Sequence, residues 1–195
     1  MYREEGSRVP NHDIIRETAI LGLLEELGIS DDHLTLVKQF NPSAALPFHG
    51  FQHLVTVALN AGAAALHERL PDDQVRAAVI AGLWHDFDHQ GDPDDRVNIG
   101  AAISGYRNLS PDVVDPLVVA AIEATLFPHT PPASTLAAVM QDADALQTLE
   151  PDGARFMVAL ERELGVLALP PAEFLAAVPL HTTWAKEKAA GVLGR

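Results

Sequence analysis

The sequence has 195 residues, 48% of them hydrophobic, and it contains no cysteine. This composition excludes a disordered chain, disulfide bonds and thiolate ligands, so any metal site must use His, Asp or Glu. The net charge of −14 argues against nucleic acid or an anionic membrane as a partner, because both bind basic surfaces. Charges or prolines interrupt every apolar run before the roughly 18 residues that span a bilayer, and the start lacks a signal-peptide pattern. We therefore expect a cytoplasmic protein that does not enter a membrane.

Apolar residues recur at helical spacing along the chain, and no segment alternates like a β-strand. We expect loose residues at 1–10 and an all-α fold, a compact orthogonal bundle of about nine helices in one domain spanning 1–195. Capping and breaking residues predict helices at 13–27, 31–40, 48–70, 72–85, 95–106, 110–128 and 134–146, followed by two or three more at 153–164, 172–178 and 182–193.

The helix predicted at 72–85 carries no charge from Ala77 to Trp84. A helix that is apolar on every side lies inside the protein. It leads into the sequence HDFDHQG at His85–Gly91, where imidazoles and carboxylates are unfavourable to bury unless something pairs with them. A divalent ion bound by the histidine and aspartate is one such partner. A simple His–Asp hydrogen bond at the end of a helix is the alternative.

Two other segments offer similar side chains. His49 and His53 lie four residues apart, so they share a face if the helix has already begun at that point. Ordinary surface or core histidines are the alternative. Asp142 and Asp144 project about 200° apart on a helix, so we expect one to face a site and the other to face solvent or a neighbouring helix. Glu123 lies in an apolar stretch, and we expect it to face the surface.

A histidine pair, then a His-Asp dyad after a buried helix, then Ala-Asp in another apolar helix resembles the HD-domain superfamily of metal-dependent phosphohydrolases. The resemblance covers roughly residues 45 to 165 and implies an all-α core with four metal ligands. Those ligands fall here on His53, His85, Asp86 and Asp144. Asp144 is chosen over Asp142 because Ala143 precedes it, as in the family pattern.

The segments Phe48–His53 and His85–Gly91 are also similar to the signatures of the cyclic-nucleotide phosphodiesterase branch, with Gly50 where that branch has asparagine. The stretch from Ile122 to Leu146 resembles small bacterial HD hydrolases. The likeness to the phosphodiesterase branch implies roles for two further histidines. His49 would be the general acid that protonates the leaving oxygen, and His89 would lie beside the metal-bound phosphate. Asn98 and His129 are expected to contact the substrate.

These resemblances imply a metal-dependent phosphohydrolase that cleaves a monoester or diester of a small phosphorylated substrate, such as a nucleotide. The cofactor would be a firmly bound divalent ion of Mn, Fe, Ni, Co, Zn or Mg, with a second ion bridged by Asp86. A diiron oxygenase on the same fold is one alternative, although only His89 and His129 could supply its extra ligands and His89 lies too close to the dyad. A non-catalytic, metal-stabilised module that binds a nucleotide is the other.

Overall fold

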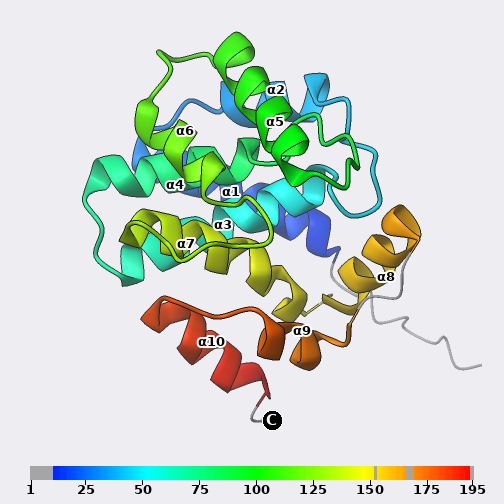
Figure 1. The fold of residues 1–195 in the computed structure, drawn as a ribbon. Coiled ribbons are helices and arrows are strands. Elements are labelled where there is room, and N and C mark those ends of the chain that lie inside the picture. The colour runs from blue at the N-terminus through cyan, green and yellow to red at the C-terminus, as the bar shows by residue number, and fades with distance from the viewer. Residues whose placement is uncertain (1–10, 152, 166–168, 194–195) are drawn as a thin grey trace, which may run out of the picture.

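The computed structural model describes residues 11–151, 153–165 and 169–193, and it confirms the all-α class (Figure 1). The expectation of a loose segment at 1–10 lies outside the described residues. Within them the chain forms ten α-helices and one short 3₁₀ helix, η1. These are α1 (His12–Leu27), α2 (Asp32–Phe40), α3 (Phe51–His67), α4 (Asp72–Trp84), α5 (Asp95–Leu109), α6 (Pro116–Glu123), α7 (Thr135–Ala145), η1 (Leu146–Leu149), α8 (Gly153–Leu164), α9 (Pro171–Ala177) and α10 (Thr183–Leu193).

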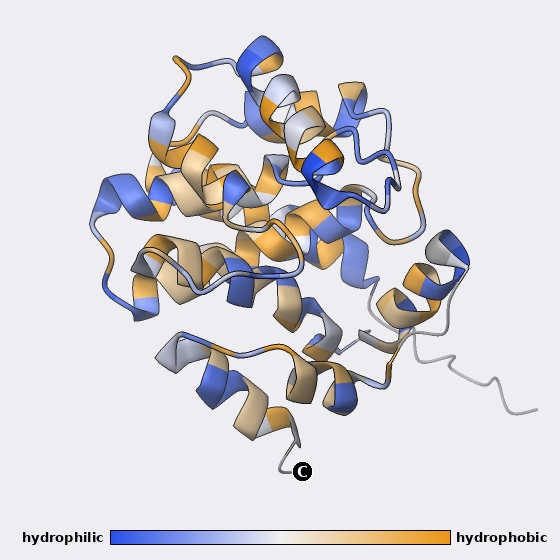
Figure 2. Cartoon of the chain, in the orientation of Figure 1, coloured by the Kyte–Doolittle hydropathy of each residue, from blue (hydrophilic) through white to orange (hydrophobic). Residues whose placement is uncertain are grey.

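Helices α3 and α4 form the centre of the molecule and pack along each other, with α1, α6 and α7 around them (Figure 1). As predicted, α4 is buried on all sides from Ala77 to Trp84. Figure 2 shows the apolar residues concentrated on these central helices. Gly82 permits the close approach, because a Cβ there would lie 2.5 Å from the Cα of Ala58 on α3. The motif that follows α4 is therefore held at the centre of the protein.

The predicted start of the third helix, at residue 48, is wrong, because α3 begins at Phe51. Gly50 precedes it with an extended backbone, and a Cβ at that position would lie 2.4 Å from the carbonyl oxygen of Leu46. The chain is thus folded tightly on itself before the helix. His49 lies in this turn rather than on the helix, so it does not share a helical face with His53.

The helix predicted at 110–128 is also shorter than expected. Its first residue is Pro116, which needs no hydrogen bond in the first turn, and the Asp115 side chain accepts from the backbone N–H of Leu117. Residues 110–114 form an exposed connection instead. The segment after α6 is consequently a loop, and the backbone N–H of its Phe127 donates to Asp95 at the start of α5.

The C-terminal helices lie at one end of the molecule beside η1 (Figure 1). A small second core joins them to η1 through the buried residues Leu146, Leu149, Ala185 and Ala189. Across the described ranges, none of the helices combines the length and the apolar character needed to cross a membrane.

Candidate metal centre

The four predicted ligands lie together where α3, α4 and α7 meet. His53 Nε2 is 2.9 Å from His85 Nε2, 2.8 Å from Asp86 Oδ2 and 3.5 Å from Asp144 Oδ1. His85 Nε2 is 3.2 Å from Asp86 Oδ2 and 3.8 Å from Asp144 Oδ1. Two atoms that are each about 2.1 Å from one ion lie roughly 3 Å apart, so the spacings among His53, His85 and Asp86 fit a single metal ion, and Asp144 lies beside these three.

Hydrogen bonds to the far side of each imidazole ring decide which nitrogen faces the site. His53 Nδ1 lies 2.5 Å from Gln147 Oε1, and His85 Nδ1 lies 3.0 Å from the carbonyl oxygen of Gly82. Both of those oxygens can only accept, so each Nδ1 carries the proton and donates it. When these rings are neutral, as metal ligands must be, each Nε2 presents a lone pair to the centre. The donor set fits a divalent cation, which would bind all of these lone pairs.

The local charges indicate the same need for a cation. Burial opposes protonation of His85, but the charges and hydrogen bonds of Asp86 and Asp144 outweigh burial and raise the pKa of His85 well above its ordinary value. Despite burial, the charge of His85 in turn holds the pKa of Asp86 well below its usual range. The centre therefore attracts positive charge, and a divalent ion supplies more of it than one proton does.

A second cluster lies beside the first and consists of His49, His89 and Glu163. His49 Nδ1 is 2.5 Å from Glu163 Oε1, and Glu163 also accepts from the backbone N–H groups of Phe48 and His49. Helix α8 thereby fixes the turn before α3. The His49 ring stacks on His89 with 3.7 Å between ring centroids. These three residues also offer a donor set that could hold an ion.

The two stacked histidines have opposite pKa shifts. Burial lowers the pKa of His49, but Asp86 and Glu163 outweigh it and raise the value overall. For His89, burial and the nearby charge of His49 lower the pKa. His89 Nδ1 accepts from the backbone N–H of Gly91, so the proton of the neutral ring is on Nε2. Groups whose environments shift their pKa values apart are suited to different steps of acid–base chemistry.

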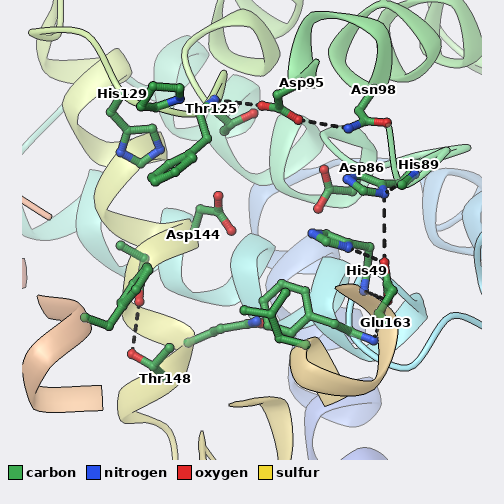
Figure 3. Close-up of a pocket in the computed structure, with 18 of the residues that line it drawn as sticks. His49, Asp86, His89, Asp95, Asn98, Thr125, His129, Asp144, Thr148 and Glu163 are labelled. Atoms are coloured by element: carbon green, nitrogen blue, oxygen red, sulfur yellow. Dashed lines mark hydrogen bonds and ion pairs between the residues drawn. The ribbon is translucent and has the colours of Figure 1, made fainter. Parts of the chain in front are cut away.

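Both clusters border one cavity of about 550 Å³. Figure 3 shows Asp86 and Asp144 facing each other across it, with His49, His89 and Glu163 on the side of Asp86. His129 lies on the side of Asp144 (Figure 3). A cavity of this size is large enough for a small organic ligand.

Asn98 and His129, the two residues predicted to contact substrate, both line this cavity, but their hydrogen bonding differs. The amide of Asn98 holds the loop after the motif, accepting from the N–H groups of Gln90 and Asp92 and donating to Asp92 and Asp95. His129 is different, since neither of its buried ring nitrogens has a hydrogen-bond partner within the described part of the chain. A direct substrate contact by either residue stays a prediction.

The two remaining acidic residues lie outside the centre. Asp142 points away from Asp144, as expected for that helix, and accepts from the backbone N–H groups of His181 and Thr182 before α10. Glu123 is exposed at the end of α6.

Sequence analysis did not identify Glu163 or Gln147. Glu163 is one of several charged residues on an amphipathic helix, so its spacing carries no signal. Gln147 contacts His53 across 94 residues, so no local pattern signals its position.

The HD-domain family model matches residues 50–149, about half of the chain, and this chain belongs to that family. The match includes all four predicted ligands and excludes His49 and Glu163. Metal-dependent hydrolases are common in the family, and its members use divalent ions. The match does not distinguish the cyclic-nucleotide branch from others. Searches of curated proteins and of solved structures found no match.

Proposed function

We propose that this protein is a metal-dependent phosphohydrolase that uses water to cleave a phosphate ester of a small molecule, a nucleotide being one candidate. One observation carries the proposal. Asp86 and Asp144 of the metal centre line the same cavity as the paired His49 and Glu163, so a metal ion and a proton donor can reach one substrate.

When bound, a divalent ion would activate a water molecule and polarise the phosphoryl oxygen. His53, His85, Asp86 and Asp144 would hold that ion. The protein supplies the remaining chemistry through its own side chains.

His49 is suited to protonate the leaving-group oxygen. Its Nδ1 is bonded to Glu163, and its other ring nitrogen faces the centre of the cavity (Figure 3). The raised pKa favours the protonated form of this ring, which a general acid requires. His89 donates from Nε2 and is suited to bind a phosphoryl oxygen without competing for the proton.

The test compares His49→Ala with wild type in metal content and in hydrolysis of p-nitrophenyl phosphate and bis-p-nitrophenyl phosphate. We expect His49→Ala to keep the ion of the first cluster and to lose turnover by about 10²- to 10⁴-fold. His67→Ala is the matched control, because His67 is a partly exposed histidine at the far end of α3. Unchanged turnover in His49→Ala would exclude the general-acid role.

Metal content also distinguishes the hydrolase from a diiron oxygenase and from a non-catalytic binding module. Loss of one of two ions in His49→Ala would show that the second cluster binds metal. About two irons per chain without hydrolysis would favour the oxygenase, although His129 belongs to neither metal-compatible cluster in the described ranges. Absence of both metal and hydrolysis would leave a binding module.

A further inference from the structure

We infer that the cavity accepts a phosphate ester with a single phosphoryl group and one uncharged, ring-sized apolar substituent, and that it rejects substrates with additional phosphates. The inference rests on the proposed function for the position of the phosphoryl group and adds the class of substrate. Two features of the cavity wall, its apolar half and its charge, carry it.

One half of the wall is apolar. It comes from the turn before α3, the loop after α6, and helices α8 and α9, and it consists of Phe48, Phe127, Pro128, Met157, Leu160 and Phe174. Phe127 lies on this wall with 53% of its surface exposed. An apolar wall next to a polar centre binds a ligand that is apolar at one end, because both surfaces leave water on binding.

The charge of the wall limits the number of phosphates that the polar end of the ligand can carry. Five carboxylates line the cavity, from Asp86, Asp92, Asp95, Asp144 and Glu163, whereas no lysine or arginine does so among the described lining residues. One divalent ion and a protonated His49 balance three of these charges, and an ion in each cluster would balance four, so at least one carboxylate stays unbalanced. Each additional phosphate would therefore bring negative charge to a wall with no cation to pair with it.

Unpaired polar atoms in the wall indicate what kind of ring the substituent contains. Both ring nitrogens of His129 and the Nε2 of Gln147 are buried without a hydrogen-bond partner in the described structure, and both residues line the cavity. The His129 ring packs edge-on against Phe127, with 5.4 Å between centroids. Buried polar groups are normally satisfied, so a bound ring with a hydrogen-bonding atom on its edge would complete this part of the wall.

The test measures binding to the full-length protein loaded with Mn²⁺, using calorimetry and three non-hydrolysable probes: methylphosphonate, phenylphosphonate and 1,4-phenylenediphosphonate. We expect phenylphosphonate to bind at least about tenfold more tightly than methylphosphonate, since only the former has an apolar ring to bury. The diphosphonate should bind more weakly than phenylphosphonate, because its second charged group meets the apolar and acidic wall.

Substitutions test which residue is responsible for the preference for phenylphosphonate over methylphosphonate. Phe127→Ala should remove most of the advantage of phenylphosphonate and leave methylphosphonate binding unchanged. Phe40→Ala is the matched control, because Phe40 is 56% exposed and does not line the cavity. Equal affinity of wild type for phenylphosphonate and methylphosphonate, tighter binding of the diphosphonate, or no binding of any probe would overturn the inference.

Hydrolysis of p-nitrophenyl phosphate by the same preparation keeps the two proposals apart. Selective binding of phenylphosphonate without hydrolysis would reject the proposed function and leave the ligand class standing. Hydrolysis without a preference for the phenyl probe would reject the ligand class alone.

Discussion

His53 and His85 are both predicted ligands of the centre, but different groups orient them. His85 donates to a carbonyl oxygen of its own helix, Gly82, which comes with the backbone of α4. His53 depends on the side chain of Gln147, which η1 brings from 94 residues away in the sequence. A side-chain substitution can therefore remove the contact of Gln147 with His53, but it cannot remove the backbone carbonyl of Gly82 that His85 contacts.

Gln147→Met should weaken metal binding by about 10- to 100-fold, because the volume is kept while the acceptor that fixes the His53 ring is lost. Gln52→Met is the control, since Gln52 precedes His53 on the same helix and donates to Glu17 instead. Competition with a chromophoric chelator measures both affinities. An affinity of Gln147→Met equal to that of wild type would show that the contact does not orient the ligand.

Glu163→Gln should move the pH profile of hydrolysis. A general acid must be protonated, so activity falls as pH rises through the pKa of His49. Burial lowers that pKa, and Asp86 and Glu163 raise it. A bound ion would offset the charge of Asp86, which leaves Glu163 as the main support. The alkaline fall in kcat should therefore occur at lower pH in Glu163→Gln and be unchanged in Glu25→Gln, at an exposed site on α1. Superimposable profiles would contradict this role.

At the scale of elements, the contact between α3 and α4 positions three of the four predicted ligands. Gly82→Ala would place a Cβ 2.5 Å from the Cα of Ala58, so the helices must separate. We expect a loss of about 1–3 kcal/mol in the free energy of unfolding, together with weaker metal binding.

Gly22→Ala is the matched control, because nothing lies within 4 Å of a Cβ at that helical position. It should stabilise the protein by about 0.5–1 kcal/mol through helix propensity. Urea unfolding of both variants measures the difference, and equal stabilities would show that the close approach is not required.

Helix α2 is joined to α4 by a buried histidine with a pH-dependent bond. Trp84 Nε1 donates to His33 Nδ1 over 3.1 Å, and His33 Nε2 lies 3.2 Å from Asp112 Oδ2. Burial lowers the pKa of His33 below 6.5, although Asp112 opposes this shift. Protonation of Nδ1 would abolish the bond from Trp84.

Because the folded state holds His33 neutral and the unfolded chain binds a proton near pH 6.5, its stabilising effect is complete above pH 6.5 and is lost as pH falls through the folded-state pKa. Wild type should therefore lose more stability between pH 7.5 and pH 5 than His33→Gln does. His67→Gln, which changes a partly exposed histidine, should behave like wild type. Parallel pH dependence in wild type and His33→Gln, measured by urea unfolding, would reject this effect.

At the scale of the whole molecule, sequence patterns predicted the features that depend on neighbouring residues and missed those that depend on distant contacts. The buried course of α4 was predicted correctly because its apolar residues run without interruption up to a His-Asp dyad. The start of α3 was missed because the steric limits at Gly50 arise from a turn that propensity does not register. Glu163 was missed because its partner His49 is 114 residues away, a pairing that only tertiary packing creates.

The net charge of −14 is a property of the whole molecule, and it does not by itself determine what the cavity binds. The overall field repels anionic ligands, but salt screens it over about 8 Å at physiological strength, so charges near the cavity determine binding there. Our central proposal is that four side chains there, from α3, the C-terminal end of α4 and α7, bind one ion.

The most direct test of that claim is the metal content of Asp144→Asn and Asp142→Asn after reconstitution with Mn²⁺ and gel filtration, measured by mass spectrometry. Asp144 faces His53 and His85, whereas Asp142, two residues earlier, binds the segment before α10. The account predicts that Asp144→Asn loses the ion and that Asp142→Asn retains it. Full metal content in Asp144→Asn, or an equal loss in both variants, would contradict the proposed centre.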